Sequence, residues 1–387
     1  MARKPGGEAA IRARIGAAPG VSPEEGHRLA GLLEAECHLS VVPNNRDGWK
    51  CGCAVNLRDD DRQILIDVQA CLGLGNLVAV RARNGSRPQV MWRIDSKVEC
   101  AALVDLLDEY PLRGRKLNEY ELWRGAVGIW VARRYGMTAE GQSQLRRLAR
   151  AIKEARVYRE PAPAAGLPDL SDPTALYYFA GFFSGEGCFT LAPPRGARFA
   201  IKLRRDDKPL LEAFRSQFQL GSVCDVATPE PWSPAAVWHV TSARDVLRGI
   251  ALFESAGLIG RKHRQFLAWR PGAEAVAHAK IERKPVDASV LTEARRALKR
   301  ATAYTPPAEP LAPDRRYVDT RTAYIDILRA WAASSERPLS CSEYQAAREL
   351  HRHWPKRDTI AFAFGGWYQA LEAAGLQGRA VRRPSAR

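Results

Sequence analysis

Residues Leu29 to Cys37 read LAGLLEAEC, and residues Phe179 to Gly187 read FAGFFSGEG. Both stretches are apolar, carry small residues four positions apart and place a glutamate, Glu36 or Glu186, at the eighth position. Small side chains let two helix backbones approach closely. We therefore predict that the two stretches are helices that pack together through their small residues, which are Gly31, Ala35, Gly181 and Gly185.

The repetition extends far beyond these two stretches. Ser22-Pro23 and Asp172-Pro173 stand 150 residues apart, as the motifs do, and each pair is typical of a helix N-cap followed by proline in the first turn. Downstream the offset becomes 146 residues and stays there. It relates Leu57 to Leu203, Asp60-Asp61 to Asp206-Asp207, Gly75 to Gly221, Trp92 to Trp238, Ser96 to Ser242, and Gly114-Arg115-Lys116 to Gly260-Arg261-Lys262. The chain is therefore predicted to contain two copies of one fold.

The overall composition is that of a globular protein that meets a polyanion. The chain has 387 residues, 46% of them hydrophobic, and a formal net charge of +16, which favours nucleic acid or an anionic membrane as the partner. No apolar run approaches the ~20 residues that cross a bilayer, and the N-terminus lacks the apolar core of a signal peptide. We therefore expect no membrane residence and a cytoplasmic location. The eight cysteines lack regular spacing, and Cys51-Gly52-Cys53 does not match the usual zinc ligand spacings.

The element order predicts an α+β fold in each copy: helix, strand, strand, helix, strand, strand, helix. Apolar and polar residues alternate as in half-buried strands over 53–58, 78–83, 89–94 and 199–204. Asp60-Asp61 and Asp206-Asp207 are predicted to open the helices that follow the second strands. Ser96 and Ser242 are predicted to cap the next helices.

Two proline-rich stretches divide the chain. The predicted organisation is a first copy with its following helix at 1–160, a linker at 161–168, a second copy at 169–285, a helix and linker at 286–313, a small helical domain at 314–378 and a basic tail at 379–387.

The polar faces of the predicted strands carry arginine, lysine, asparagine and glutamine with almost no acid. Such side chains suit a β-ribbon in the major groove of DNA, where arginine reads guanine and asparagine or glutamine reads adenine. For any one residue, a solvated strand face is the alternative. The candidate DNA-binding residues are Asn56, Arg58, Arg81, Arg83, Gln89, Arg93, Lys202, Arg204 and His239.

Glu36 and Glu186 are the candidate catalytic and metal-binding residues. A carboxylate at a helix C-terminus is disfavoured by roughly 0.3–1 kcal/mol, and two converging carboxylates raise each other's pKa. A divalent cation relieves both effects, and oxygen ligands beside a phosphate favour Mg²⁺. We therefore predict metal-dependent phosphodiester hydrolysis, in which the metal lowers the pKa of bound water. The alternative is a core helix pair with two solvated glutamates.

The two motifs closely resemble those of the LAGLIDADG homing endonucleases, and the resemblance covers roughly residues 22–285. It implies two pseudo-symmetric copies that form a saddle-shaped sheet across a long double-stranded DNA target, within one monomeric chain. It also implies that Glu36 and Glu186 bind the metal, that the two sites cut opposite strands to leave short 3′ overhangs, and that the protein acts in intron homing. Lys116 and Lys262 are the candidates for the basic catalytic residues that the family places around the metals.

The first motif departs from the family pattern at one position that matters. Cys37 stands where the family usually has glycine, so the chain is expected to leave the first helix less tightly and to misplace Glu36. Ser184 stands at a sixth position that is usually acidic.

Residues 354–376 resemble the small helical repeat that accompanies many homing endonucleases. A helix from Asp358, a break at Gly365-Gly366 and a helix from Trp367 to Gly375 are expected, and His351 and His353 are expected at the surface. We predict an extra DNA contact on a tether, with a packing module as the alternative. The leading function is a site-specific double-strand DNA endonuclease. The alternatives are a non-cleaving transcriptional regulator and an RNA-splicing maturase.

Overall fold

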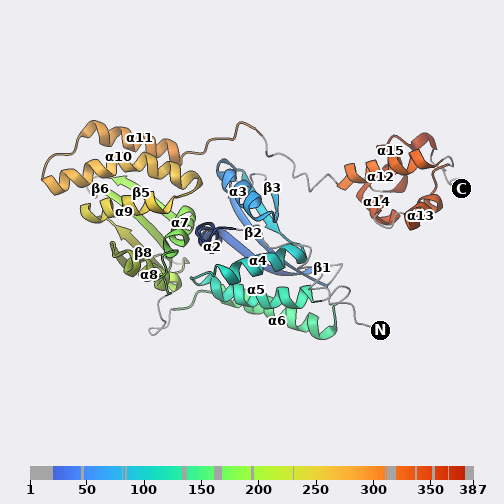
Figure 1. Cartoon of the computed structure of the whole chain (residues 1–387), viewed down its shortest axis with the longest axis horizontal. Coiled ribbons are helices and arrows are strands. Elements are labelled where there is room, and N and C mark those ends of the chain that lie inside the picture. The colour runs from blue at the N-terminus through green and yellow to red at the C-terminus, as the bar shows by residue number, and fades with distance from the viewer. Residues whose placement is uncertain are drawn as a thin grey trace. The chain divides into compact units, whose positions relative to one another are not determined.

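Two compact units make up the part of the chain that the computed structural model describes, and they divide between residues 309 and 310 (Figure 1). No described helix is long and apolar enough to cross a membrane. Arg81, Arg83, His351 and His353 lie outside the described residues. These residues are 21–44, 48–80, 82, 85–132, 137–160, 168–192, 196–229, 231–309, 311, 320–335, 338–350, 354–364 and 366–379.

The first copy follows the predicted order of elements and adds two helices. Its elements are α2 (Pro23–Glu36), β1 (Cys37–Asn44), β2 (Gly48–Arg58), the 3₁₀ turn η1 (Asp59–Asp61), α3 (Arg62–Leu72), β3 (Asn76–Val80), β4 (Gln89–Ile94), α4 (Lys97–Glu109), α5 (Lys116–Val131) and α6 (Ala139–Ala155).

The second copy repeats this order element by element. Its elements are α7 (Ala175–Glu186), β5 (Gly187–Ala192), β6 (Gly196–Arg204), η2 (Arg205–Asp207), α8 (Lys208–Phe218), β7 (Ser222–Val226), β8 (Ala235–Val240), α9 (Ala243–Ala256), α10 (Gly260–Glu282) and α11 (Ala288–Thr302). Helix α11 packs on α10 as α6 packs on α5, so the duplication includes this last helix pair (Figure 1).

Each copy contains a four-stranded antiparallel sheet, ordered β1-β2-β4-β3 in the first and β5-β6-β8-β7 in the second. The register pairs Val55 with Trp92 and Ile201 with Trp238, and all four side chains are buried. The Trp92 and Trp238 indoles donate to the carbonyls of the residues at matched positions before β3 and β7, at 2.9 and 2.8 Å. The predicted duplicated α+β fold is confirmed, with one face of each sheet forming a core against helices.

Local corrections concern the ends of elements. The strand expected over 78–83 is β3 at Asn76–Val80, and α7 begins at Ala175 rather than directly after Asp172. The Asp172 carboxylate instead accepts the N–H of Thr174 at 2.7 Å in the preceding turn. The caps predicted at Ser22, Ser96 and Ser242 are present, because each hydroxyl accepts a main-chain N–H of its first helical turn.

The second unit is a small helical domain made of α12 (Thr320–Ser334), α13 (Cys341–Leu350), α14 (Arg357–Phe364), α15 (Trp367–Ala373) and the turn η4 (Gln377–Arg379). Trp331, Tyr344, Trp354 and Leu371 lie in its hydrophobic core. Arg379, expected in the basic tail, donates to the Ala332 carbonyl at 2.7 Å and so belongs to this unit. Two of the expected helix ends shift slightly, since α14 begins one residue before Asp358 and α15 ends two residues before Gly375.

Candidate active site at the junction of the two copies

Helices α2 and α7 cross at the centre of the first unit, in backbone contact at two glycines (Figure 1). A side-chain carbon at Gly31 would overlap the carbonyl oxygen of Tyr178, and one at Gly181 would overlap that of Arg28. One turn further on, a side-chain carbon at Gly185 would lie 2.6 Å from Cβ of Ala35. The structure therefore brings all four predicted interface residues into one helix crossing, which fixes the relative position of the two helix ends.

Glu36 and Glu186 are the last residues of these two helices. The Glu36 carboxylate reaches the partner helix, since a side-chain carbon at Gly185 would lie 3.1 Å from its Oε1. Desolvation raises the pKa of Glu36 against the lowering effect of Lys116 and Arg261. Desolvation and the nearby Glu36 carboxylate raise the pKa of Glu186 to about 7. From the described residues neither carboxylate accepts a hydrogen bond or forms an ion pair, so both oxygen pairs are available to a ligand.

The substitution of glycine by Cys37 does not disturb the end of the first helix. Cys37 has φ −78° and ψ 150°, and Gly187 has φ −69° and ψ 157°, so both are extended and suit any residue. At position 187 of the second copy glycine is required by packing, because a side-chain carbon there would overlap the Phe183 ring. The smaller Leu33 stands at the matched position of the first copy. The expectation that Cys37 misplaces Glu36 is therefore wrong.

Lys116 and Lys262 lie buried beneath the two helix ends. The Lys116 ammonium donates to the carbonyls of Leu33 at 3.2 Å and Cys37 at 2.7 Å, and the Lys262 ammonium donates to the carbonyl of Gly187. Desolvation and the nearby Arg261 lower the pKa of Lys262 to about 8. Each lysine thus holds the main chain directly after a glutamate, and each places a cationic group beside the two carboxylates.

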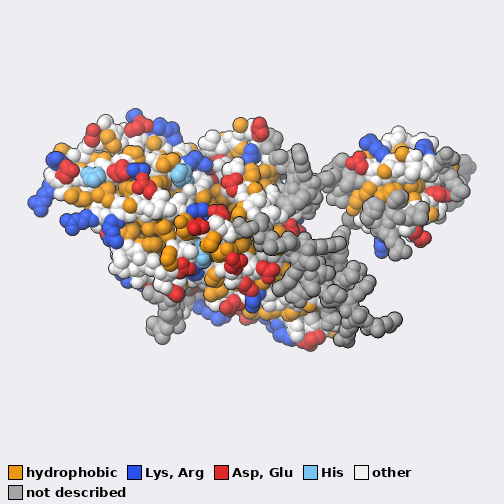
Figure 2. All heavy atoms as spheres, in the orientation of Figure 1, with side chains coloured by type: hydrophobic (Ala, Val, Ile, Leu, Met, Phe, Trp, Pro, Cys, Tyr) orange, Lys and Arg blue, Asp and Glu red, His pale blue; other side chains and the backbone are white. Residues whose placement is uncertain are grey.

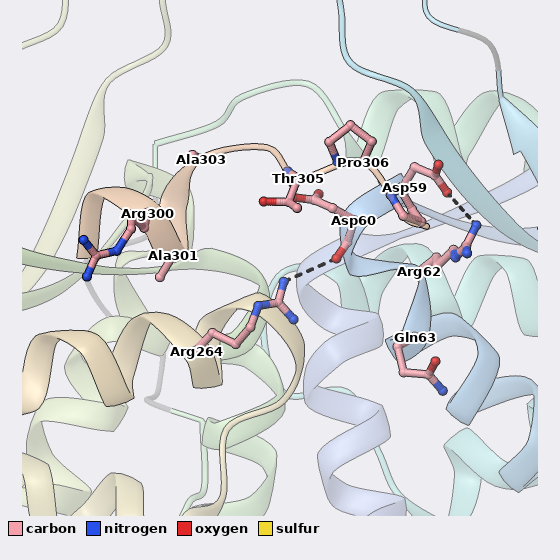
Figure 3. Close-up of a pocket in the computed structure, with 11 residues that line it drawn as sticks. Asp59, Asp60, Arg62, Gln63, Arg264, Arg300, Ala301, Ala303, Thr305 and Pro306 are labelled. Carbon is pink, nitrogen blue, oxygen red and sulfur yellow. Dashed lines mark hydrogen bonds and ion pairs between the residues drawn. The ribbon is translucent and has the colours of Figure 1, made fainter. Parts of the chain in front are cut away.

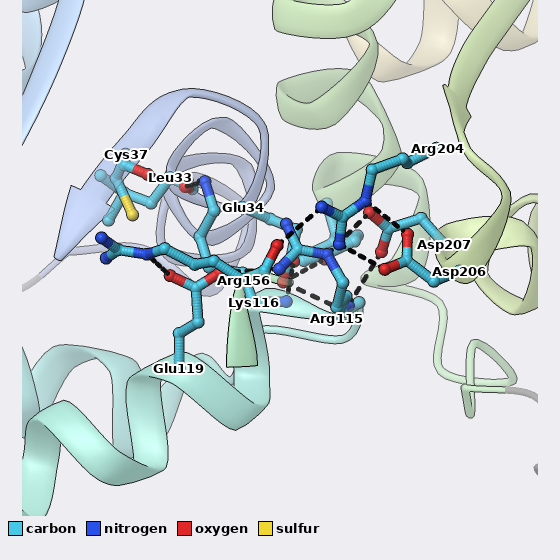
Figure 4. Close-up of polar contacts among 12 residues, drawn as sticks. Leu33, Glu34, Cys37, Arg115, Lys116, Glu119, Arg156, Arg204, Asp206 and Asp207 are labelled. Carbon is cyan, nitrogen blue, oxygen red and sulfur yellow. Dashed lines mark hydrogen bonds and ion pairs between the residues drawn. The ribbon is translucent and has the colours of Figure 1, made fainter. Parts of the chain in front are cut away.

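Sequence reasoning missed the residues that hold the two lysine-bearing helices. The buried Glu34 carboxylate accepts the N–H groups of Arg113 and Gly114, both at 3.1 Å, and that of Lys116 at 3.0 Å, and so caps α5 (Figure 4). In the second copy the Ser184 hydroxyl accepts the N–H of Ile259 at 3.1 Å, directly before α10. The sixth motif position signals this role, because it places a hydrogen-bond acceptor on the buried side of each motif helix.

The predicted DNA-binding residues that the structure describes share the outer faces of the two sheets. The register sets Arg58 opposite Gln89, Ala54 opposite Arg93 and Ala200 opposite His239. Asn56 and Lys202 are exposed on the same faces. The His239 ring lies 3.3 Å from the Ser222 hydroxyl, so it already has a neighbour on the strand beside it.

Three of the predicted arginines have carboxylate partners. Arg58 pairs with Asp60 through two nitrogens and donates to the Thr302 and Ala303 carbonyls, both at 3.3 Å. Arg204 pairs with Asp206 in the same way. Arg93 forms an ion pair with Asp95 at 3.1 Å. Carboxylates just beyond the strand ends thus turn back onto these three arginines.

Figure 2 shows one side of the molecule, on which Lys and Arg side chains gather where α10 and α11 are joined. Lys284 and the helix-ending Arg283 are exposed there. This cluster adds positive charge away from the carboxylates, in keeping with the net charge of the chain.

Comparison with known proteins identifies the same architecture elsewhere. Residues 29–127 match the protein family described as LAGLIDADG endonuclease. A relative from Neurospora crassa named "Probable intron-encoded endonuclease 3" is 24% identical over 264 residues. That alignment covers 62% of this chain and 48% of the relative, so this chain spans about half the length of the curated relative.

Solved structures of similar fold cover most of the first unit. The I-SmaMI structure with an uncleaved DNA target and calcium ions is 20% identical, with a TM-score of 0.55, over 71% of this chain and 97% of that one. The I-GzeII structure in complex with its DNA target is 18% identical, with a TM-score of 0.55, over 71% of this chain and 97% of that one. The fold is that of these single-chain, two-copy proteins.

Proposed function

We propose that this two-copy chain is a LAGLIDADG homing endonuclease that cuts both strands of one long double-stranded DNA target. The observation that carries the proposal is the pair of carboxylates at the crossing of α2 and α7, held side by side without a donor from the described residues. Two adjacent, partly desolvated acids do not stabilise a helix crossing, so packing alone does not explain them. Two matched acids, one in each copy, suit a reaction carried out twice, once on each DNA strand.

The donor set suits a divalent cation. Glu36 and Glu186 offer only carboxylate oxygens, which hard cations prefer. Within the described residues no group of three or more His, Cys, Asp or Glu side chains could hold a metal ion, so in this proposal DNA phosphate and water supply the other ligands. We propose Mg²⁺ as the physiological ion. When bound, it would lower the pKa of a water molecule and stabilise charge on the phosphate.

The two lysines have a structural and an electrostatic part in this proposal. By holding the carbonyls of Cys37 and Gly187, they fix the direction in which each glutamate leaves its helix. A buried ammonium that donates to main-chain carbonyls also adds positive charge next to a scissile phosphate, where negative charge develops during hydrolysis.

The partner is proposed to be DNA bound across the outer faces of the two sheets by a monomer. Asn56, Gln89 and Lys202 remain candidates for base or phosphate contacts, while Arg58 and Arg204 are engaged elsewhere. We propose that the second unit is the helical repeat expected from the sequence and that it adds a DNA contact through its tether, in a cytoplasmic protein.

The test is cleavage of a library of linear DNA that contains randomised or host-derived sites, with Mg²⁺ or with EDTA. The full chain, Glu36→Gln and Glu186→Gln are compared. Double-strand cuts that need Mg²⁺ and disappear in both variants are expected. Nicking that depends on Glu186 alone would show that only one site is active.

The same experiment separates the alternatives. Specific binding to one sequence without any cut, with or without Mg²⁺, would favour a transcriptional regulator. Tighter binding to a structured intron RNA than to any duplex DNA would favour a maturase. Either result would overturn the proposed endonuclease.

A further inference from the structure

Two aspartates reach from one copy to the other in a reciprocal way. Asp61 of the first copy accepts the main-chain N–H of Arg261 at 2.6 Å, and Asp207 of the second copy accepts that of Arg115 at 3.1 Å. Donors and acceptors are both related by the 146-residue offset of the repeat. Figure 4 shows Asp207 and Arg115 facing each other across the junction. Neither aspartate caps its own following helix through its side chain.

Each of these bonds lies at the start of a helix that carries a buried lysine. Arg261 and Lys262 are in the first turn of α10, and Arg115 directly precedes Lys116 at the start of α5. A carboxylate at a helix N-terminus stabilises the exposed N–H groups and the positive end of the helix dipole. Gly260 allows the close approach, because a side-chain carbon there would overlap Ile64 and lie 2.5 Å from the Asp61 carboxylate.

A second pair of contacts also joins the two copies reciprocally at the same junction. Arg58, held by Asp60, reaches the Thr302 carbonyl at the end of α11, and its guanidinium lies 5.7 Å from the centre of the Tyr304 ring. Figure 3 shows this side of the junction, with Asp60, Thr305 and Arg264 around a cavity of about 480 Å³.

The second copy makes the equivalent contact with the first copy. Arg204, held by Asp206, donates to the Arg156 carbonyl at 2.7 Å, and its guanidinium lies 5.8 Å from the centre of the Tyr158 ring (Figure 4). Arg156 and Thr302 are 146 residues apart, as are Tyr158 and Tyr304. The contacts across the junction are therefore reciprocal: each copy makes with the other the same contact that it receives, as in an isologous interface.

We propose that Asp61 and Asp207 are positioning residues that place each copy's lysine-bearing helix from the opposite copy, so that neither half of the active site reaches its cleaving geometry without the other. The inference rests on the proposed endonuclease function. It assigns to the two aspartates no contact with DNA or metal, only the placement of Lys262 and Lys116.

The two halves differ in how much they depend on this contact. Helix α5 has a second cap within its own copy, where Glu34 accepts three N–H groups. Among the described residues, the start of α10 has one such side-chain bond within its own copy, from the Ile259 N–H to Ser184. Asp61 is also the more buried of the two aspartates and makes the shorter bond. Loss of Asp61 is therefore expected to disturb α10 more than loss of Asp207 disturbs α5.

The first arm of the test needs neither DNA nor metal. Hydrogen exchange of the main-chain amides at the start of α10 is measured in the full chain, in Asp61→Ala and in Asp61→Asn, which keeps an acceptor oxygen. Asp59→Ala, a neighbour whose ion pair to Arg62 stays within its own copy, is the matched control. Faster exchange confined to Asp61→Ala is expected. Wild-type exchange in Asp61→Ala would overturn the proposal.

The second arm measures cleavage of each strand and DNA affinity in EDTA. Asp61→Ala is expected to lower strand cleavage by ~10–100-fold, the usual effect of removing a residue that orients an active-site group. DNA affinity should stay within about twofold, Asp61→Asn should restore most of the rate, and Asp207→Ala should lose less. Wild-type cleavage in Asp61→Ala, or equal losses of cleavage and affinity, would overturn the proposal.

If the unaltered chain cuts no DNA, the endonuclease proposal fails, while the hydrogen-exchange measurement still decides whether Asp61 holds α10.

Discussion

Glu36 and Glu186 occupy positions that the fold alone disfavours. Each carboxylate lies at the negative end of a helix dipole, and the two lie close enough for Glu36 to raise the pKa of Glu186. At the residue scale, the proposed active site thus holds unfavourable electrostatic energy that a bound cation and a phosphate would relieve.

Replacing one acid should therefore stabilise the metal-free protein. The pKa of Glu186 is about 7 in the folded chain and near its ordinary value of 4.5 when unfolded, so the folded state binds more protons between these values and loses stability as the pH rises through 7. Glu186→Gln removes this loss. The melting temperature without metal should rise by on the order of 2 °C at pH 8, with little difference at pH 5. A lower melting temperature of Glu186→Gln at pH 8 would contradict the electrostatic account.

At the scale of elements, the crossing of α2 and α7 depends on two glycines. Gly31→Ala inserts a methyl group against the Tyr178 carbonyl, where no flexible side chain can move aside. Overpacking of this kind typically costs about 1–3 kcal/mol. We expect a loss of stability in this range and weaker cleavage, because the glutamates move apart; chemical denaturation and strand cleavage measure both.

The matched control is Gly128→Ala on α5, where nothing lies within 4 Å of the added carbon. Alanine is the better helix former, so this change should stabilise the chain by about 0.5–1 kcal/mol. Equal stability of Gly31→Ala and the unaltered chain would show that the helices do not cross as described.

The duplicated fold could be predicted from the sequence because its signals are local or repeat at a fixed offset. Periodicity defined the strands, Ser22, Ser96 and Ser242 marked helix starts, and the two glutamates followed from the motif. The small residues of the motifs also indicated the helix crossing. Each of these features depends on neighbours in sequence or on comparing one copy with the other.

The reciprocal contacts between the copies could not be predicted in this way. Asp61 and Asp207 look like helix-opening acids in the sequence, and Arg58 looks like a free strand cation. Their partners are some 90 to 245 residues away, so only the packing of the two copies reveals them. The role of Cys37 was misjudged for a related reason, since the need for glycine depends on the ring of Phe183 and not on the backbone angles.

At the scale of the whole molecule, the positive charge should appear as a salt dependence of DNA binding. The net charge of +16 favours many phosphate contacts. With about 6–10 such contacts, affinity should fall by roughly 10³–10⁵ between 50 and 200 mM salt. Fluorescence anisotropy with a labelled duplex across this range measures the slope, and a flat profile would exclude an electrostatic DNA-binding face.

The second unit should contribute affinity but no chemistry. It has its own hydrophobic core, and the two glutamates belong to the first unit. Ending the chain after Glu309 should weaken DNA binding by about 10²-fold or more, since a tethered second contact is lost. Cleavage at saturating protein should keep its rate and position. Unchanged affinity would show that the unit serves another purpose.

Strand-resolved cleavage measures whether the site of each copy cuts one strand of the target. A duplex that carries the identified target, with a different label on each strand, is treated with Mg²⁺ and the full chain, Glu36→Gln or Glu186→Gln. We expect one cut in each strand, staggered to leave short 3′ overhangs, and loss of double-strand cleavage in either variant. Cleavage of both strands by Glu36→Gln or Glu186→Gln at the rate of the unaltered chain would contradict this expectation.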